Sequence, residues 1–407
     1  MKPRPSAITV EAGDSRAPRY HRLRAAARDA APAVLGFAMV RAVGVAVLLY
    51  CGHRRGDPAL ERLATIWDAE RYGNIAVNGY DCGLPVLATS PQAGNACSNL
   101  AFFPLYPALI RLVHSLTSLP VPHAALLVSW LASLTAAWGI FAVAAWRYGK
   151  HTGVLAAVLW GALPHAVVES MAYTEALFTA LAAWSLFAAL TQRWIWAGVL
   201  CALAGLTRPS AVALVVAIDG AAAVALVRIR RRPARQPAKA GWRPCLGALI
   251  APLGWLGFIT WVGARLGHWD GYFAVQRLWR SRFDWGVTTV RQLGRVFLHP
   301  TSVPFAWMVV ALVLCAAIAL GAMTVTHGQP LPLVVYSVGL LVIAVGDSAF
   351  FGARARFLVP AFPLLLPLAV GLARVRSGSV RVLLLGSTTA LSALYGAYLV
   401  FAVDHAP

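Results

Sequence analysis

The sequence predicts an all-α protein that crosses a membrane many times. Hydrophobic residues make up 59% of the 407 positions and charged residues only 12%, whereas soluble domains average about 45–50% apolar and about 25% charged residues. Repeated apolar runs are also long enough to cross a bilayer as helices, and we expect about ten or eleven such crossings. Because these runs use up the length, we predict a single transmembrane domain over residues 32–407.

The basic residues predict the orientation of this domain. The formal net charge is +20. The basic residues cluster beside the apolar runs, where Lys and Arg mark the cytoplasmic side and attract anionic lipid. No nucleic-acid-binding motif accompanies them. We therefore expect the tail 1–31 and the loops 228–243 and 374–381 to be cytoplasmic. The loops 51–100, 265–300 and 346–356 would then lie on the outer face of a plasma membrane.

The tail itself has two interpretations. A cleaved signal peptide would need a short basic region and a small-x-small cleavage site. Residues 1–31 are long for such a region, and no cleavage site follows Leu49. We therefore expect a retained basic tail that precedes the first span, near Ala33–Tyr50.

The first outer loop, 51–100, is expected to carry helices that lie in the membrane interface. Apolar residues recur at helical spacing between Pro58 and Tyr80, which predicts one interfacial helix there. The following residues are rich in Gly, Pro, Ser and Asn and predict an irregular flap. Cys82 and Cys97 lie in this flap and are candidates for a disulfide if the loop faces an oxidising compartment.

A short polar island inside this loop is the first candidate site. Asp68 lies there beside an expected membrane surface, where a carboxylate can take a proton from an attacking hydroxyl. On a helix, Arg71 and Tyr72 would lie on the same side as Asp68. Trp67 and Tyr72 would either line a sugar or anchor an ordinary interfacial helix at headgroup level.

Glu70 is a further acidic candidate for substrate binding in this island. Two positions along a helix separate it from Asp68, so the two carboxylates would point apart. A divalent cation, which prefers several oxygen ligands together, is therefore possible but not favoured here. We predict no cofactor and no metal.

A second set of polar residues lies where an apolar run begins. Glu175 follows Tyr173 and Thr174 at the start of the run TEALFTALAAW. Thr174 suits the N-cap of a helix, and Glu175 would be favoured in its first turn by the helix dipole. The alternative is that Tyr173 and Glu175 belong to a polar substrate site near the membrane face.

Arginines inside apolar sequence need partners, because a buried charge is costly without one. Arg208 lies within GLTRPSAVAL, and its partner would be the phosphate of a lipid carrier or one of the acids Glu175 and Asp219. Arg354 and Arg356 precede a predicted span, where arginines either bind phosphate or snorkel toward the membrane surface. We take all three arginines as candidates for phosphate binding.

The path of the chain between residues 101 and 227 has two possible arrangements. In the first, Ala101–Leu119 is re-entrant and Ala197–Val227 folds as two short segments around Thr207–Ser210. In the second, each of these segments crosses once. The first arrangement places Glu175 and Arg208 on the same face as Asp68. It is the one that we favour, because charges inside apolar runs usually line a functional cavity.

Several blocks of this sequence resemble a known family in the same order. WDAERYGNIAVNGY, followed after an insertion by NLAFFPLYPALI, is similar to the first outer loop of the GPI mannosyltransferase 2 (PIG-V) family, a branch of the multi-span GT-C glycosyltransferases. AYTEALFTALAAW and LAGLTRPSAVAL resemble the next two family blocks. RARFLVPAFPLL is similar to a late block with arginine and proline that many GT-C enzymes share.

The resemblance implies a GT-C fold and a mannose donor linked to a polyprenyl phosphate. It also implies a catalytic aspartate in the first outer loop, which is Asp68 here, and basic residues that hold the donor phosphate. The excess of Ala, Arg, Gly, Pro and Trp is typical of a bacterium, so the acceptor would be a cell-envelope glycolipid, glycan or protein. The alternative from another class is a flippase that moves a lipid-linked sugar without reacting with it.

Overall fold

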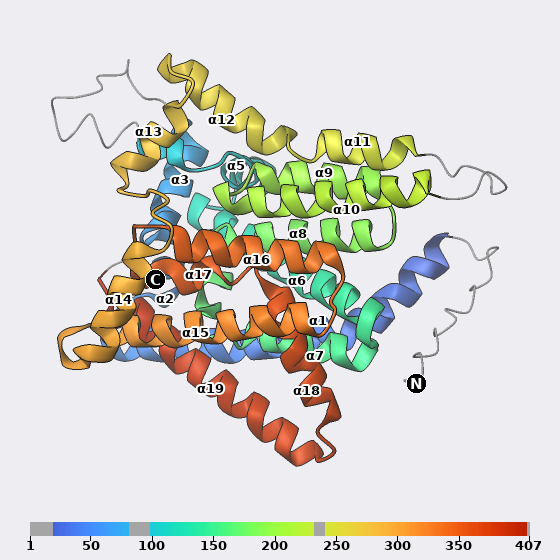
Figure 1. Cartoon of the computed structure of the whole chain (residues 1–407). Helices are drawn as coiled ribbons and strands as arrows, with labels where there is room; N and C mark the ends of the chain where they lie inside the picture. The colour runs from blue at the N-terminus through green and yellow to red at the C-terminus, as the bar shows by residue number, and fades with distance from the viewer. Residues whose placement is uncertain (1–18, 81–97, 232–240, 405–407) are drawn as a thin grey trace.

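The computed structural model describes residues 19–80, 98–231 and 241–404, and this part of the chain is helical with one isolated bridge and no strand (Figure 1). The predicted all-α, multi-span class is therefore confirmed. Six described segments are long and apolar enough to cross a membrane. They lie in α1 (Arg19–Arg55), α6 (Val121–Tyr148), α10 (Val212–Arg230), the pair α11 (Trp242–Ile250) and α12 (Leu253–Leu266), α15 (Phe305–Thr326) and α19 (Gly378–Ala402).

Shorter helices supply the other segments that the hydropathy pattern predicts to be spans. A bent pair, Phe351–Phe357 and Phe362–Arg374, passes the same test as one broken span with a 77° bend. Three shorter apolar helices lie beside the long ones: α8 (Glu175–Leu190), α9 (Trp194–Gly205) and α16 (Leu331–Gly346). The remaining α-helices are α2 (Ala59–Thr65), α3 (Asp68–Asn78), α5 (Leu105–Thr117), α7 (Lys150–Gly161), α13 (Gly271–Leu278), α14 (Val287–Leu298), α17 (Arg354–Phe357) and α18 (Leu366–Arg374).

Proline and glycine set the ends of several spans. α6, α15 and α16 each begin directly after a proline, whose fixed φ suits a helix start. α12 is followed by Gly267, which adopts φ +70°, a conformation that is strained for residues with a Cβ atom. The long apolar sequence between such signals then forms helices because every backbone group must be hydrogen-bonded inside a bilayer.

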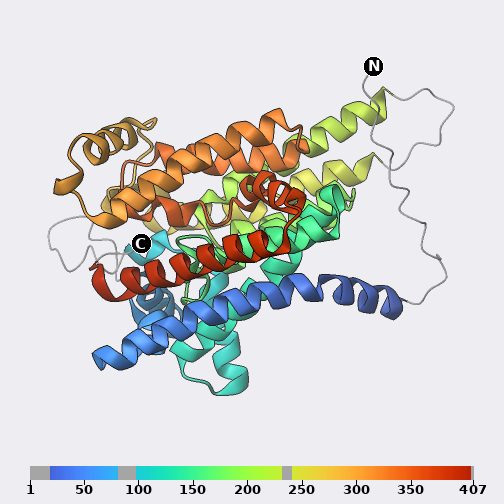
Figure 2. The same cartoon turned by 90° about the horizontal axis from the view of Figure 1, so that it is seen from below.

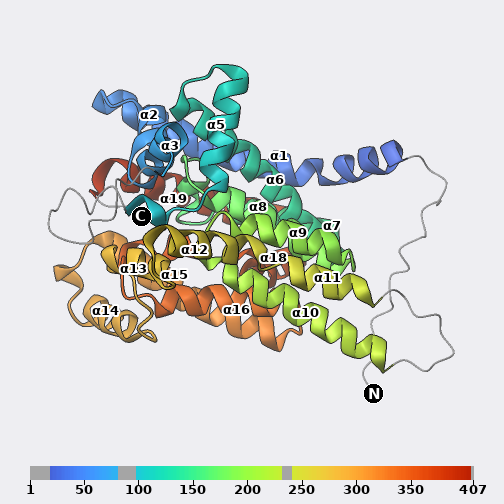
Figure 3. The same cartoon turned by 90° about the horizontal axis from the view of Figure 1, so that it is seen from above.

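Basic segments that are far apart in the sequence meet at one end of the helix bundle. The start of α1, the turn between α6 and α7, and the start of α19 meet at one end, where Lys150 Nζ lies 2.8 Å from Asp29 Oδ1 and Arg381 Nη1 lies 2.5 Å from His151 Nε2. The arginine-rich end of α10 lies at the same end in Figures 1 and 3. α2, α3, α13 and α14 lie at the opposite end, which we call the site end (Figures 1 and 2).

The structure has two helices where one interfacial helix was predicted over Pro58–Tyr80. The prediction of one continuous helix was therefore wrong. α2 ends before Ile66, and α3 starts at Asp68. Trp67 separates them with φ +55° and ψ −120°, a backbone conformation that is strained for a bulky residue. The predicted end of the helix near Gly79 agrees with the structure.

Two predicted spans are shorter as helices than the apolar sequence suggests. α7 ends at Gly161, and residues 162–174 continue through the interior as a largely buried segment without α-helix, which contains only the short 3-10 helix η2 (Ala166–Glu169). The predicted span Phe357–Ala373 is bent at Leu358–Ala361. Pro164 and Pro360 lie in these breaks, and proline removes a helical hydrogen bond and excludes the preceding residue from the helix.

The chain around Arg208 has the break and the short α5 of the first predicted arrangement, but Pro209–Arg230 is long enough to be a candidate span and is not the short segment that was predicted. α9 and α10 are separate helices joined at 206–211, and α5 is not among the candidate spans. α9 packs so closely on α11 that a Cβ atom added at Gly198 would lie only 2.3 Å from the carbonyl oxygen of Gly247. This close contact, typical of small residues between membrane helices, holds the helix that leads to Arg208.

Candidate active site

A large cavity opens at the site end, between segments that lie far apart in the sequence. Its volume is about 800 Å³, which falls in the range of small-molecule sites. The charged side chains of Asp68, Arg208 and Arg356 line one part of it. Other parts are apolar or aromatic and are formed by Phe102, Val212, Trp255, Phe273, Leu340, Ile343 and Phe357. The cavity can therefore hold a molecule with one anionic and one apolar part.

Asp68 owes its position to the break between α2 and α3. It is the first residue of α3, where the unpaired N–H groups of the helix favour a negative charge. Its side chain is 24% exposed and lines the cavity. The strained backbone of Trp67 turns the chain directly before it. Such strain is maintained where the surrounding structure needs that conformation, often at functional sites.

Four charged residues from four separate segments form one chain of ion pairs. Asp68 Oδ2 lies 2.9 Å from Arg356 Nη1, and Arg356 Nε lies 3.2 Å from Glu175 Oε1. The same oxygen of Glu175 lies 2.5 Å from Arg208 Nη1. Glu175 is 1% exposed and the two arginine side chains 7% and 12%. These charges are compensated by one another, as buried charges must be.

Hydroxyl groups and aromatic rings complete the surroundings of this chain. Thr174 Oγ1 accepts a hydrogen bond from Arg208 Nη1 (3.1 Å) and shares another with the Tyr72 hydroxyl (3.2 Å). Thr174 occupies the predicted N-cap position of α8, but its side chain makes no capping bond. Burial raises the pKa of the Tyr72 hydroxyl above its ordinary value, so Tyr72 stays protonated. The guanidinium of Arg356 lies over the Tyr173 ring, 5.0 Å from its centroid.

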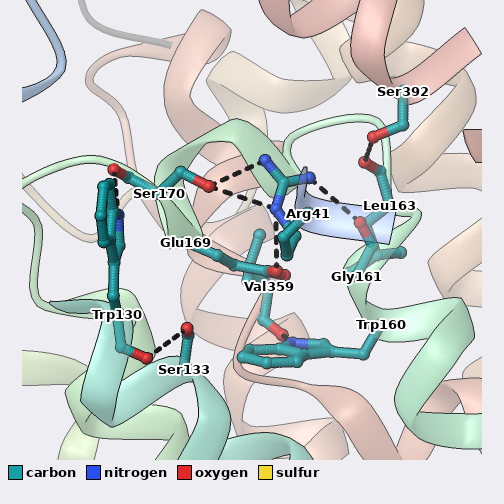
Figure 4. Close-up of polar contacts among 10 residues, drawn as sticks. All are labelled: Arg41, Trp130, Ser133, Trp160, Gly161, Leu163, Glu169, Ser170, Val359 and Ser392. Carbon is teal, nitrogen blue, oxygen red and sulfur yellow. Dashed lines mark hydrogen bonds and ion pairs between the residues drawn. The ribbon is translucent and has the colours of Figure 1, made fainter. Parts of the chain in front are cut away.

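The buried segment 162–174, which leads to Glu175, is held by side chains from other helices (Figure 4). Arg41 of α1 donates to Gly161 O (3.1 Å) and twice to Ser170 Oγ (3.2 and 3.0 Å). Trp130 Nε1 of α6 donates to Ser170 O (3.0 Å). Non-helical backbone at membrane depth is stable only when it is satisfied in this way. Arg41 therefore helps to position the residues that precede Glu175.

Replacing Arg41 by methionine is expected to destabilise the protein by about 1–3 kcal/mol. The change keeps the apolar stem but leaves buried hydrogen-bond acceptors, Ser170 Oγ and Gly161 O, without their donor. The midpoint of thermal unfolding in detergent measures this loss. Arg54→Met, on the exposed side of the same helix, is the matched control. Equal midpoints for the two variants would contradict the assigned role of Arg41.

The structure places the other predicted site residues in different surroundings. Tyr173 lies against Arg356, and Arg71 lies over the Trp279 ring, 5.9 Å from its centroid. Trp67 packs against the core, and Glu70 is exposed; neither is among the cavity-lining residues. Cys82 and Cys97, the predicted disulfide pair, lie outside the described residues.

Arg354, the remaining arginine candidate, is buried away from the cavity. Its guanidinium donates to Thr289 Oγ1 and to the backbone carbonyl of Asp347, and it is fully buried. It therefore ties α14 to the loop before α17. Arg356, two residues later, is the arginine that faces the cavity.

Sequence reasoning did not select several residues that the fold brings to the site. Thr174 was expected only as a cap, and Asp347 was not singled out although it lines the cavity. Asp347 Oδ1 accepts bonds from Ser281 Oγ (3.1 Å) and Ala349 N (2.9 Å). Burial raises the pKa of its carboxyl. The sequence signal that could have identified Asp347 is its position as a single acidic residue at the end of an apolar run.

Comparison with known proteins adds one sequence match. The model of the dolichyl-phosphate-mannose-protein mannosyltransferase family matches residues 102–255, a region that includes Glu175 and Arg208 but not Asp68 or Arg356. No curated protein matches the chain. The apo crystal structure of the oligosaccharyltransferase from Archaeoglobus fulgidus matches with 14% identity and a TM-score of 0.40, over 73% of this chain and 48% of that one.

The family match bears on the class of enzyme. It covers less than half of the chain, and it supports a membrane glycosyltransferase of the GT-C class. The closer resemblance to the GPI mannosyltransferase 2 family stays a prediction. The chain spans about half the length of the oligosaccharyltransferase that it matches.

Proposed function

We propose that this protein is a membrane mannosyltransferase that takes mannose from a polyprenyl-phosphate donor. The observation that carries the proposal is the ion-pair chain at the cavity, in which Asp68 lies 2.9 Å from Arg356 and Glu175 joins Arg356 to Arg208. A carboxylate beside two guanidinium groups supplies a proton acceptor and an anion site within one cavity. The acceptor is a cell-envelope glycolipid, glycan or protein.

The reaction follows from these two functions. The acceptor hydroxyl oxygen attacks the anomeric carbon of mannose, and the bond from that carbon to the phosphate oxygen breaks. Asp68 takes the hydroxyl proton, and the electron pair of the broken bond leaves with the polyprenyl phosphate. Attack opposite the leaving group inverts the anomeric configuration. No nucleotide and no metal take part in this scheme.

The arginines stabilise the leaving phosphate. An arginine has five N–H donors, and the ion pairs of Arg208 and Arg356 use one or two nitrogen atoms of each. Donors therefore remain for a phosphate. Fixed charges that face a developing anion in a dry site are often worth several kcal/mol in the transition state. The apolar wall of the cavity would receive the start of the polyprenyl chain.

The proposal includes a location and an orientation. The protein is a multi-pass protein of a bacterial plasma membrane, with its N-terminus in the cytoplasm and the site end on the outer face. Support comes from three basic segments, the start of α1, the end of α10 and the start of α19, which lie at the end of the bundle opposite Asp68. Lys and Arg mark the cytoplasmic side of membrane proteins.

The test uses the purified full chain in detergent with labelled polyprenyl-phosphate mannose and an extract of the cell envelope. We expect a labelled glycosidic product with inverted configuration, and a slower reaction with polyprenyl-phosphate glucose. Donor binding without product would contradict the enzyme and favour a flippase for lipid-linked sugar. Faster transfer of glucose would contradict mannose as the donor sugar.

A further inference from the structure

α14 presents an apolar stripe on the side that faces away from the protein. Val287, Val290, Phe297 and Leu298 are each more than half exposed, and at helical spacing they fall within a sector of about 100°. The opposite side packs against the protein through Thr289 and Val296, which are buried. The exposed apolar stripe therefore has no covering partner within the described part of the chain.

Two arginines border this stripe. Arg291 and Arg295 are exposed, and neither forms an ion pair with any acid in the described residues. No Asp or Glu occurs between residues 285 and 304. Arg277 of the preceding helix differs, since it pairs with Asp270 at 3.0 Å. The exposed side of α14 thus combines an apolar stripe with uncompensated positive charge.

α14 lies directly beside the start of a candidate membrane span. The helix ends at Leu298, and the candidate span α15 begins at Phe305. α14 is inclined to α15 and lies at its site end (Figures 1 and 2). Trp285, two residues before the start of α14, is 87% exposed. An amphipathic helix with arginines and a tryptophan at this level is typical of elements that lie in the membrane interface.

We propose that α14 binds the headgroups of anionic lipids. The apolar stripe would lie at the boundary of the acyl chains, and Arg291 and Arg295 would pair with lipid phosphates. A neutral bilayer would cover the apolar stripe but would not compensate the charge of the two arginines. The unpaired arginines favour a negatively charged surface, because each basic residue near such a surface adds about fivefold to the affinity.

Bound lipid would also stabilise the loop that carries Arg356. Thr289 of α14 accepts a hydrogen bond from Arg354 and donates one to the carbonyl oxygen of Val345. Arg354 also binds the carbonyl of Asp347. A helix fixed in the headgroup region would therefore support the segment 345–356 from outside.

The test measures lipid contact in the full chain and does not depend on enzymatic activity. The protein is reconstituted into phosphatidylcholine liposomes that contain either brominated phosphatidylcholine or brominated phosphatidylglycerol at equal mole fraction. The Trp285 signal is the difference in fluorescence between the wild type and Trp285→Phe. We expect stronger quenching of this signal by the brominated phosphatidylglycerol.

The double variant Arg291→Gln/Arg295→Gln, with and without Trp285→Phe, examines the cause of this preference. We expect its preference for phosphatidylglycerol to fall by about fivefold for each arginine removed. The control, Arg228→Gln/Arg230→Gln at the other end of the bundle, should keep the preference of the wild type. Both pairs are exposed, so neither change disturbs the core.

Three results would overturn the proposal. Equal quenching by the two lipids would mean that α14 does not select anionic headgroups. The absence of quenching by either lipid would place Trp285 in water. Loss of the preference on addition of millimolar inorganic phosphate would assign the arginines to a soluble anion. None of these results would affect the proposed mannosyl transfer, which is measured separately.

Discussion

Replacing Asp68 by asparagine is expected to lower the rate of mannose transfer by about 10²–10⁴-fold, the range that a general base contributes. Asparagine has nearly the same size, but its amide cannot take the hydroxyl proton. The fold should be preserved, because the Asp68 side chain is 24% exposed and Arg356 keeps its ion pair with Glu175.

The measurement is the initial rate of transfer from labelled polyprenyl-phosphate mannose, together with the midpoint of thermal unfolding. Glu70→Gln is the matched control, since Glu70 lies two residues further on α3 and is exposed. We expect the control to transfer mannose at the rate of the wild type. If Asp68→Asn retained more than a tenth of that rate, Asp68 would not be the general base.

The sequence allowed the members of the ion-pair chain to be selected before their geometry was known. Glu175, Arg208 and Arg356 are charges inside or beside apolar runs, and such charges must find partners or line a cavity. Asp68 stands out for the opposite reason, as an acid in a polar loop. The separation of α9 and α10 was also predictable, because Arg208 and a proline follow directly on Thr207.

The local backbone around the site was not predictable in the same way. Nothing in the apolar pattern of 58–80 indicates that Trp67 adopts φ +55°, because tertiary contacts maintain that conformation. The break after α7 follows from Pro164, but the apolar pattern conceals how far the non-helical segment extends. Its backbone groups are satisfied by residues as distant as Arg41, which local sequence does not reveal.

Hydrogen bonds between loops that are far apart in the sequence could not be predicted from the sequence either. Residues 281–284 bind 346–348 through Asp284 N to Gly346 O (2.8 Å) and Ser348 N to Arg282 O (2.8 Å). This pairing places Asp347 at the cavity and gives Arg354 a structural partner in Thr289. Arg354 and Arg356, the two arginines of RARF, both lie just before a predicted span, so the sequence does not distinguish them. Only their tertiary surroundings distinguish Arg356, at the cavity, from Arg354, buried beneath α14.

Replacing Glu175 by glutamine should be far more damaging to stability than replacing Asp68. Both Arg208 and Arg356 contact the same oxygen, Glu175 Oε1. Removing this charge leaves the buried Arg208 without an acidic partner and Arg356 with Asp68 alone, and an uncompensated buried charge costs about 3–5 kcal/mol. We therefore expect a clearly lower midpoint of thermal unfolding, together with loss of mannose transfer because the phosphate site is no longer organised.

A second substitution separates charge compensation from side-chain packing. Glu175→Gln/Arg208→Gln also removes the cation that Glu175→Gln leaves unpaired, so it should regain part of the lost stability without regaining activity. Glu61→Gln, an exposed change on α2, should leave both properties unchanged. If the double variant were no more stable than Glu175→Gln, the cost would come from packing around residue 175. Glu175 would then not be the anion that holds the two arginines together.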